Sequence, residues 1–179
     1  MIKGKNYGLR AVEEKDLEKL RDWRNMTEFR RNFREVRELS LEDQQAWLKS
    51  VNLSKQNNFM FSIVKLDSKE LIGAAGLLYI NWVIRSADFS FYIGKDELYI
   101  DNKGIANEVA SLLINYGFEN LNLNKIWMEL YEFDSKKISF FKKLNFKEDG
   151  KLRDNCFEDG KFHDSYIISL LKNDWNLSK

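Results

Sequence analysis

A strand, a helix and a second strand follow one another in the second half of the chain, and this succession restricts the fold more than any other feature. Residues 86–94 and 125–131 alternate in polarity, as strands do. Between them, apolar side chains recur at the helical period, at Ile105, Val109, Leu112, Leu113 and Tyr116. Because such a crossover is right-handed and places its two strands side by side, we expect one parallel strand pair.

The remaining strands are expected to pair mainly in the antiparallel sense. Residues 59–64 and 71–80 predict a hairpin, whose second strand is apolar on both faces and therefore central. Further strands are expected at residues 8–12, 146–152 and 162–171. Helices are expected to begin after three capping residues, Asp16, Ser40 and Asp134.

These elements predict a single domain over residues 1–179, of mixed α/β (α+β) class. Its central sheet is expected to be mostly antiparallel, with one parallel crossover pair and helices on both faces. The composition, with 44% hydrophobic and 32% charged residues, is typical of a globular protein.

Charge and cysteine content limit the classes of function. A formal net charge of +1 argues against a dedicated nucleic-acid-binding protein. With Cys156 as its single cysteine and His163 as its single histidine, the chain forms no internal disulfide, and we expect no metal site. Residues 1–6 contain no apolar signal segment, and no apolar run is long enough to cross a membrane. We therefore expect a cytoplasmic protein.

The loop before the predicted helix at 105–116 contains Gly104. The first N–H groups of a helix have no intrahelical partner and can bind an anion, and a glycine lets a ligand approach the backbone. A plain turn is the alternative explanation for this glycine. Because strand–loop–helix units are common, the choice depends on the rest of the chain.

Three stretches of the chain carry further patterns. The first is Asp101-Asn102-Lys103-Gly104-Ile105-Ala106, in the loop just described. The second runs from Asp134 to Phe146, across the last predicted helix. The third comprises Trp23-Arg24-Asn25, Phe29-Arg30, Ser40-x-Glu42 and Trp47.

Taken together in this order, the stretches resemble the GNAT superfamily of N-acetyltransferases, over essentially the whole chain. The first resembles its acetyl-CoA loop, Arg/Gln-x-x-Gly-x-Gly/Ala, with Asp101 in the Arg/Gln position. The second resembles its Asn…Tyr-x-Lys-x-Gly-Phe stretch, with Phe141 in the Tyr position and Asn145 in the Gly position. The chain looks most like the branch that contains ribosomal-protein acetyltransferases, and the third stretch looks like enzymes acting on nucleotide-linked amino sugars.

This resemblance implies acetyl-CoA as the cofactor and acyl transfer from its thioester to an amine. The helix start at Gly104 would hold the pyrophosphate, and a backbone N–H near residues 91–93 would polarise the thioester carbonyl. The expected cofactor-binding residues are Phe91, Tyr92, Ile93, Asn102, Lys103, Gly104, Ile105, Ala106, Asp134, Lys137 and Phe141.

Catalysis by such an enzyme requires a proton acceptor, because a free alkylammonium has a pKa of about 10.4. Asp88 and Glu129 are the expected bases, since each lies on the polar face of a strand beside the cleft; a structural ion pair is the alternative for each. The departing thiolate needs a proton, which Phe141 cannot donate. Tyr131 is the expected donor, and the alternative is that no dedicated acid exists.

The acceptor is expected to contact Trp23, Arg24, Arg30 and Tyr92. Arg24 and Arg30 would bind a phosphate or carboxylate, whereas Arg31 and Arg34 are expected on a solvated face. Packing in the core is the alternative for Trp23. His163 is expected at the surface.

The acceptor predicted from these residues is a small-molecule primary amine, first of all a nucleotide-linked amino sugar. The alternatives are a protein N-terminus, a polyamine, or no acceptor at all, in which case the chain is a non-catalytic acyl-CoA-binding sensor. The Arg-rich segment favours an anionic acceptor over a polyamine, which would require an acidic cleft. The protein is expected to be a monomer or a homodimer, without nucleic-acid or membrane partners.

Overall fold

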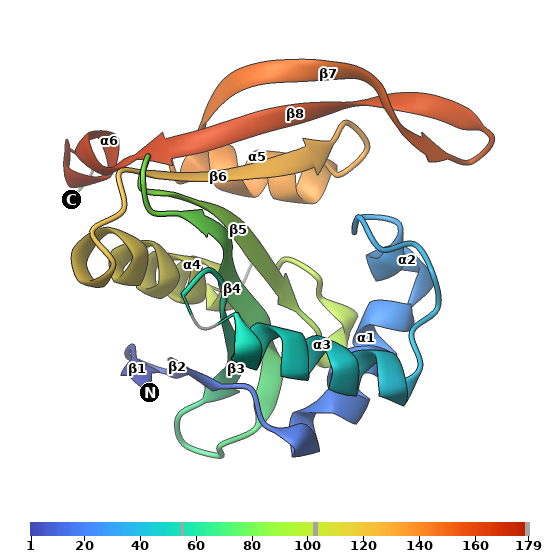
Figure 1. The fold of residues 1–179 in the computed structure, drawn as a ribbon, viewed down its shortest axis with the longest axis vertical. Coiled ribbons are helices and arrows are strands. Elements are labelled where there is room, and N and C mark those ends of the chain that lie inside the picture. Colours follow the sequence, from blue (N-terminus) through green and yellow to red (C-terminus); the bar gives the residue numbers. More distant parts are fainter. Residues whose placement is uncertain (55, 102–103, 178–179) are drawn as a thin grey trace.

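The computed structural model describes residues 1–54, 56–101 and 104–177. Its strands form one eight-stranded sheet in the order β1-β2-β3-β4-β5-β6-β8-β7 (Figure 1). The strands are β1 (Ile2–Lys3), β2 (Tyr7–Ala11), β3 (Phe59–Lys65), β4 (Leu71–Asn81), β5 (Ser86–Ile93), β6 (Lys125–Tyr131), β7 (Lys147–Glu158) and β8 (Lys161–Leu171). All neighbouring strands pair antiparallel except β5 and β6, which are parallel. The predicted mixed sheet with one parallel crossover pair is therefore confirmed.

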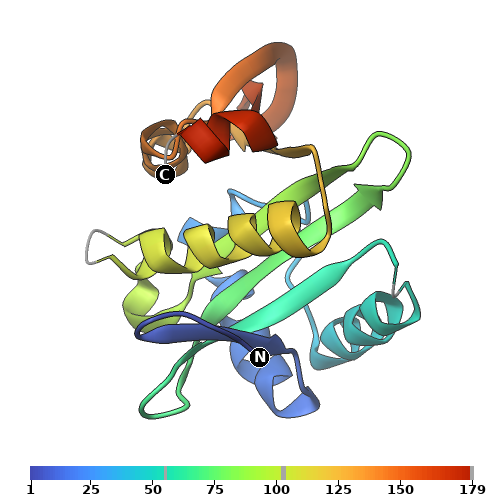
Figure 2. The same ribbon diagram turned by 90° about the vertical axis from the view of Figure 1, so that its left-hand side faces the viewer.

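Helices cover both faces of this sheet, as predicted (Figures 1 and 2). They are α1 (Leu17–Asn25), α2 (Thr27–Arg30), α3 (Leu41–Leu53), α4 (Ile105–Asn115), α5 (Ser135–Lys143) and α6 (Lys172–Leu177). Residues 116–120 continue α4 as one π-helical turn. Within the described ranges, no helix is both long enough and apolar enough to span a bilayer.

The alternation of β5 determines which helices each face receives. Phe89, Phe91 and Ile93 join the larger core cluster, together with α4 and α5 residues such as Val109 and Phe141. Tyr92 faces the other way, into a second cluster with Leu20, Trp23 and Phe29 of α1 and α2. The predicted division of this strand into two faces is therefore confirmed, and each face is covered by a different group of helices.

The parallel pair β5 and β6 is short. Its register runs only from Ser86 opposite Lys125 to Asp88 opposite Trp127, although both strands continue beyond these residues. Figure 1 shows the two strands leaving one another at a wide angle. The C-terminal halves of β5 and β6 therefore have open edges that face each other.

Several boundaries differ from the sequence prediction. The strands β7 and β8 extend to a two-residue turn in which Asp159 and Gly160 both have positive φ, 52° and 79°. An Asp-Gly pair is a strong hairpin signal, because both central residues of that turn type need positive φ. The short elements β1, α2 and α6 were not expected; each has fewer residues than a periodicity analysis resolves.

Of the helix caps predicted at Ser40 and Asp16, only the first forms as a side-chain cap. Ser40 and Asp43 form the predicted capping box at the start of α3, since the Asp43 N–H donates to Ser40 Oγ at 3.0 Å. Asp16 makes no side-chain cap for α1. Instead its carboxylate accepts two hydrogen bonds from the Arg10 guanidinium, both at 2.7 Å, and one from Ser62 Oγ at 2.8 Å. Asp16 therefore joins β2, β3 and α1.

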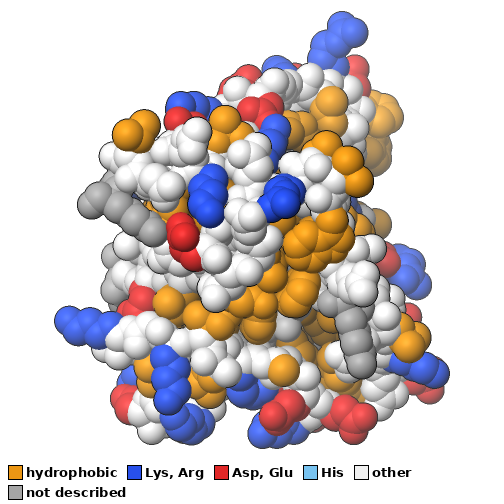
Figure 3. All heavy atoms as spheres, turned by 60° about the vertical axis from the view of Figure 1, so that its left-hand side comes forward, with side chains coloured by type: hydrophobic (Ala, Val, Ile, Leu, Met, Phe, Trp, Pro, Cys, Tyr) orange, Lys and Arg blue, Asp and Glu red, His pale blue; other side chains and the backbone are white. Residues whose placement is uncertain are grey.

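Surface charge is mixed on the face drawn in Figure 3. There the Lys and Arg side chains lie among acidic and apolar side chains across the whole view.

Candidate functional site

The open edge of β5 provides a backbone donor at one position. The Ile93 N–H donates to the Tyr99 carbonyl at 2.8 Å, and Gly94 N–H donates to Ile72 of β4 at 2.9 Å. Because successive N–H groups of a strand point to opposite edges, the Phe91 N–H points to the same edge as that of Ile93, and Tyr92 points toward β4. Phe91 is therefore the donor best placed to polarise a carbonyl between β5 and β6. The expectation for Ile93 is corrected, since Tyr99 already uses its N–H.

The start of α4 is occupied by a side chain of the protein itself. Gly104 has φ of +94°, and a Cβ placed there would meet nothing within 4 Å. The Asp101 carboxylate accepts the N–H groups of Ile105 at 3.1 Å and Ala106 at 2.6 Å. Two of the N–H groups expected to bind pyrophosphate are thus hydrogen-bonded to an internal anion. Asn102 and Lys103, also expected to bind the cofactor, lie outside the described residues.

A cavity of about 940 Å³ lies between the N-terminal end of α4 and the helix α5. It is lined by Glu97, Leu98, Ile100, Asp101, Gly104, Asn107, Ser135, Lys136, Ser139, Phe140, Lys143 and Leu144. Phe140 stacks on Phe91 with ring centroids 6.1 Å apart, and so connects this cavity to the open edge of β5.

Phe141 does not reach this cavity. Its ring is fully buried in the larger core, in edge contact with Phe89 and Phe146 at 5.4 and 5.1 Å. The expectation that it contacts the cofactor is therefore wrong in geometry, because the helical phase of α5 turns Phe141 inward and Phe140 outward. The aromatic side chain that sequence analysis missed is Phe140.

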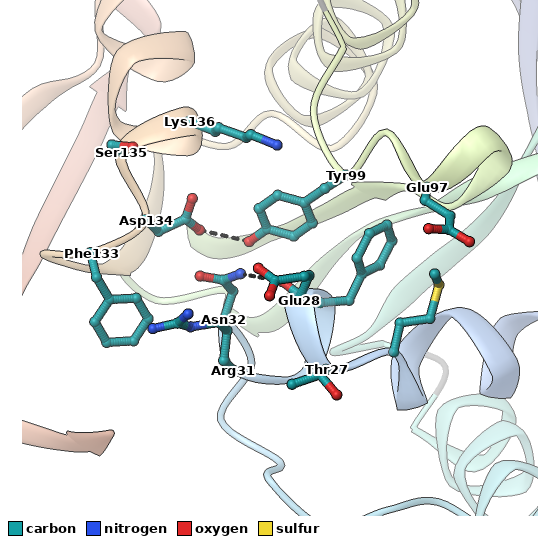
Figure 4. A pocket seen from close by; sticks show the side chains of 12 residues that line it. Thr27, Glu28, Arg31, Asn32, Glu97, Tyr99, Phe133, Asp134, Ser135 and Lys136 are labelled. Atoms are coloured by element: carbon teal, nitrogen blue, oxygen red, sulfur yellow. Dashed lines mark hydrogen bonds between the residues drawn. The ribbon is translucent and has the colours of Figure 1, made fainter. Parts of the chain in front are cut away.

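A second cavity of about 550 Å³ lies between α2 and the segment that joins β6 to α5 (Figure 4). It shares Glu97, Ser135 and Lys136 with the first cavity. Inside it the Tyr99 hydroxyl donates to Asp134 Oδ2 at 2.6 Å, and the other oxygen of Asp134 accepts the Lys137 N–H at 3.1 Å. Asp134 is thus the cap of α5, as predicted, and its carboxylate is held by Tyr99.

Asp88 and Glu129 converge where β5 and β6 separate. Both bond to the Arg34 guanidinium, Asp88 Oδ2 at 2.7 Å and Glu129 Oε2 at 3.4 Å. Asp88 is only 6% exposed, and this burial raises the pKa of its carboxyl above the ordinary value although Arg34 acts in the opposite direction. Glu129 also accepts from Asn155 at 2.6 Å and from Ser165 at 2.8 Å. The two predicted bases therefore share one site.

Arg34 has a role that sequence analysis did not assign to it. Its side chain is 48% exposed, as expected for a solvated face, but its guanidinium also pairs with both carboxylates. The preceding residue, Phe33, packs edge-on against Tyr92 at 5.6 Å. No spacing rule could identify this pair, because residues 31–40 form an irregular segment between α2 and α3.

Two further cations lie next to Phe33. The Arg24 guanidinium is 4.0 Å and the Lys137 ammonium 5.3 Å from the centre of that ring. The Arg24 Nε atom is buried and has no hydrogen-bond partner in the part of the chain that the structure describes. Burial lowers the pKa of both side chains below their ordinary values. Because buried cations are stabilised by anions, these two favour a negatively charged group nearby.

Three other residues were expected to contact the acceptor: Trp23, Arg30 and Tyr92. The Trp23 ring packs directly on Gly94, so closely that a Cβ at Gly94 would lie 2.0 Å from it, which matches the core alternative. Arg30 points away from both cavities, with its nearest ion pair to Glu38 at 3.9 Å. Tyr92 is fully buried between α1, α2 and β5.

Tyr131 and His163 also differ from expectation. Tyr131 packs on Phe133 at 5.5 Å, and burial raises the pKa of its hydroxyl to about 12. His163 is buried instead of exposed, with Nδ1 2.8 Å from a Glu132 carboxylate oxygen. Among the described residues, His, Cys, Asp and Glu side chains form no group of three or more that could hold a metal ion.

Comparisons with known proteins agree with this geometry. A family model described as an acetyltransferase (GNAT) domain matches residues 7–147. The uncharacterized N-acetyltransferase p20 of Bacillus licheniformis is 32% identical over 128 residues, which are 72% of this chain and 70% of that protein. The spermidine N(1)-acetyltransferase of Vibrio cholerae is 28% identical over 167 residues, 92% of each chain.

The fold has solved counterparts as well. The crystal structure of spermidine N-acetyltransferase from Vibrio cholerae, in complex with CoA and spermine, superposes with a TM-score of 0.86 over 96% of this chain and 98% of that chain, at 24% identity. The family match covers well over half of the chain, and the strand divergence and the helix start at Gly104 occupy the expected places. The chain is therefore an N-acetyltransferase that belongs to the acetyltransferase (GNAT) domain family.

Proposed function

We propose that this enzyme transfers the acetyl group of acetyl-CoA to a primary amine of a small polyamine-type molecule. The observation that carries the proposal is the convergence of Asp88 and Glu129 on one cation where β5 and β6 separate. In the structure this cation is the guanidinium of Arg34. Two carboxylates that hold a guanidinium in this position are also suited to hold an acceptor ammonium.

The same carboxylates suit the proton transfer. The acceptor must lose a proton before its nitrogen can attack the thioester carbonyl, and Asp88 is suited to accept it because burial raises the pKa of its carboxyl. The Phe91 N–H points to the edge where the carbonyl oxygen would lie, so it can stabilise the developing negative charge. The cavity beside Gly104 is placed to hold the cofactor's phosphates.

The names of the related enzymes support a polyamine over the other candidate acceptors. The Vibrio cholerae protein with 28% identity is named a spermidine N(1)-acetyltransferase, and its similarity extends over 92% of both chains. The smaller cavity adds Glu28, Glu97 and Asp134 to the carboxylate pair, against Arg31 and Lys136. The Arg-rich segment was expected to favour an anionic acceptor, and these carboxylates oppose that preference.

A nucleotide-linked amino sugar is the second candidate, favoured by Arg24. This buried guanidinium has no carboxylate within ion-pair distance in the described part of the chain, and it stacks on Phe33. A phosphate or carboxylate of the acceptor would supply the missing anion. A polyamine would leave Arg24 without one.

A thiol-release assay with acetyl-CoA distinguishes these candidates. The panel contains spermidine, spermine, putrescine, a nucleotide-linked amino sugar and a peptide with a free N-terminus. We expect thiol release with the polyamines; release with the amino sugar alone would replace the first candidate by the second. Tight acetyl-CoA binding without release from any amine would identify a sensor.

Two variants test the role of the carboxylate. Asp88→Asn should lower kcat/KM by about 10²- to 10⁴-fold, the usual contribution of a general base. Asp22→Asn, which changes an exposed carboxylate paired with Arg21 on α1, is the matched control and should leave kcat/KM unchanged. Equal activity of the two variants would contradict the proposed base.

A further inference from the structure

Acyl transfer from a thioester leaves a thiolate, and the residues expected to protonate it are poorly suited to do so. Phe141 has no hydroxyl and is buried in the core. Tyr131 has a hydroxyl, but burial raises its pKa to about 12, so it is a weaker acid than an ordinary tyrosine. A better proton donor would be another acidic group close to the open edges of β5 and β6.

Lys137 has the right position on α5. Its side chain leaves the helix one turn before Phe141 and ends beside Phe33 and Tyr99, two rings of the cluster on the Tyr92 face of β5. Its Nζ atom is 4.6 Å from the centre of the Tyr99 ring and 5.3 Å from that of Phe33. Tyr99 pairs with the end of β5, and α5 follows directly after β6. The ammonium therefore lies close to the C-terminal end of β5.

The Lys137 side chain is buried without a direct anionic partner. The residue is 8% exposed, and among the described residues no carboxylate forms a hydrogen bond or ion pair with its ammonium. Three charged groups act on it from a distance: Asp134 at the start of α5, Asp88 on β5 and Arg24 on α1. The two carboxylates favour the charged form of Lys137, whereas Arg24 disfavours it. The aromatic rings of Tyr99 and Phe33 complete the surroundings. A buried cation that has a cationic neighbour and forms no ion pair of its own attracts an anion.

We propose that the Lys137 ammonium stabilises and protonates the CoA thiolate as it leaves. When the acceptor nitrogen forms its bond to the acetyl carbon, the carbon–sulfur bond breaks and its electron pair stays on sulfur. The sulfur then takes a proton from Nζ, and Lys137 regains one from solvent. The proton lost by the acceptor passes to the carboxylate site. This inference rests on the proposed acetyl transfer, but not on which amine is the acceptor.

The acidity of the two groups is compatible with this transfer. A free thiol has a pKa of about 8.5 and a free lysine about 10.4. Burial is the largest effect on Lys137 and lowers its pKa, toward that of the thiol. A proton donor is most effective when its pKa is close to that of the group it protonates and to the working pH. Lys137 meets this condition better than Tyr131 does.

The test titrates the thiol of CoA bound to the enzyme, followed by the ultraviolet absorbance of the thiolate against pH. In the wild-type complex the thiol should titrate below its value in free CoA. Lys137→Met, which keeps the length and removes the charge, should raise the pKa of the bound thiol by at least about one unit, a tenfold loss of thiolate at a given pH. Lys137→Arg, which keeps the charge, should preserve most of the lowering.

Two controls separate this role from a structural one. Lys142→Met removes an exposed lysine of the same helix and should leave the titration unchanged. In turnover, Lys137→Met should lower kcat far more than it raises the KM for acetyl-CoA. The same thiol pKa in wild type and Lys137→Met would overturn the inference. Because the titration uses CoA without an acceptor, its result stands whatever the amine panel shows.

Discussion

At the scale of single residues, the ion pair of Arg34 with Asp88 and Glu129 sets the charge of the site. Arg34 comes from an irregular segment, yet it contacts carboxylates on two strands that are 41 residues apart along the chain, at positions 88 and 129. Burial raises the pKa of Asp88, and the guanidinium limits that rise. The proton affinity of the proposed base is therefore controlled by a residue far from it in sequence.

Arg34→Met should shift the acidic limb of the kcat/KM profile to higher pH. Removal of the guanidinium removes the interaction that favours the charged Asp88, so the pKa of Asp88 rises further and the base is protonated over a wider pH range. The measurement is kcat/KM for the best amine between pH 5 and 9. Arg37→Met, which breaks an exposed pair with Glu35 in the same segment, is the control. A shift in the opposite direction would show that Asp88 is not the titrating group.

At the scale of elements, the start of α4 combines two features with opposite effects on an anion. Gly104 has a left-handed backbone and opens onto the larger cavity, which favours close approach of a phosphate. The Asp101 carboxylate, only 6% exposed, already accepts the N–H groups of Ile105 and Ala106. Phosphates bound at the start of α4 would therefore meet a helix end that an internal negative charge has partly neutralised.

Asp101→Asn should raise the affinity for CoA about two- to fivefold. The amide oxygen can still accept one of the two N–H groups that Asp101 binds, but the negative charge at the helix N-terminus is removed. Such charges are worth about 0.3–1 kcal/mol. Isothermal calorimetry with CoA measures the change. Asp43→Asn makes the same substitution at the cap of α3 and should alter stability without altering CoA affinity. Weaker CoA binding in Asp101→Asn would show that this charge positions the loop.

At the scale of the whole molecule, the N-terminal strand, the first helix and the sheet are joined through a buried ion pair. Asp16 is 3% exposed and bonds to Arg10 of β2 and Ser62 of β3. Burial acts to raise the pKa of Asp16, but the hydrogen bonds from Arg10, the Glu13 backbone and Ser62 outweigh it, and the pKa lies below the ordinary value. The folded state thus depends on the charged form.

Asp16→Asn should reduce the free energy of unfolding by about 2–3 kcal/mol at neutral pH, because it removes the charge from the buried group that accepts the Arg10 hydrogen bonds. Since the pKa of Asp16 is lowered on folding, its stabilisation is complete above the unfolded value of about 3.9 and is lost as the pH falls through the folded value. The difference between wild type and variant should be constant above about pH 5 and shrink below about pH 4. Urea titrations across this range measure it, with the exposed Asp22→Asn as control. A difference that does not change at low pH would contradict this assignment.

Most of the fold followed from local patterns. Alternation over residues 86–94, helical periodicity over residues 105–116 and the strand at residues 125–131 were sufficient to predict the parallel pair. These signals are strong because each depends on burial of one face of one element. The cap of α5 at Asp134 was also predictable, since it involves neighbouring residues only.

The composition of the site depended on tertiary structure. Whether Phe140 or Phe141 lines the cavity depends on the rotation of α5 against the sheet, and one residue changes the answer. Arg34, Asp88, Glu129 and Lys137 come from four separate segments, and electrostatic coupling between them arises only once β5 and β6 diverge. The sequence by itself thus determined the family and the sheet, because those rest on local periodicity and motifs. Tertiary structure alone decided which charges meet, because ion pairs form between groups that packing brings within a few ångströms.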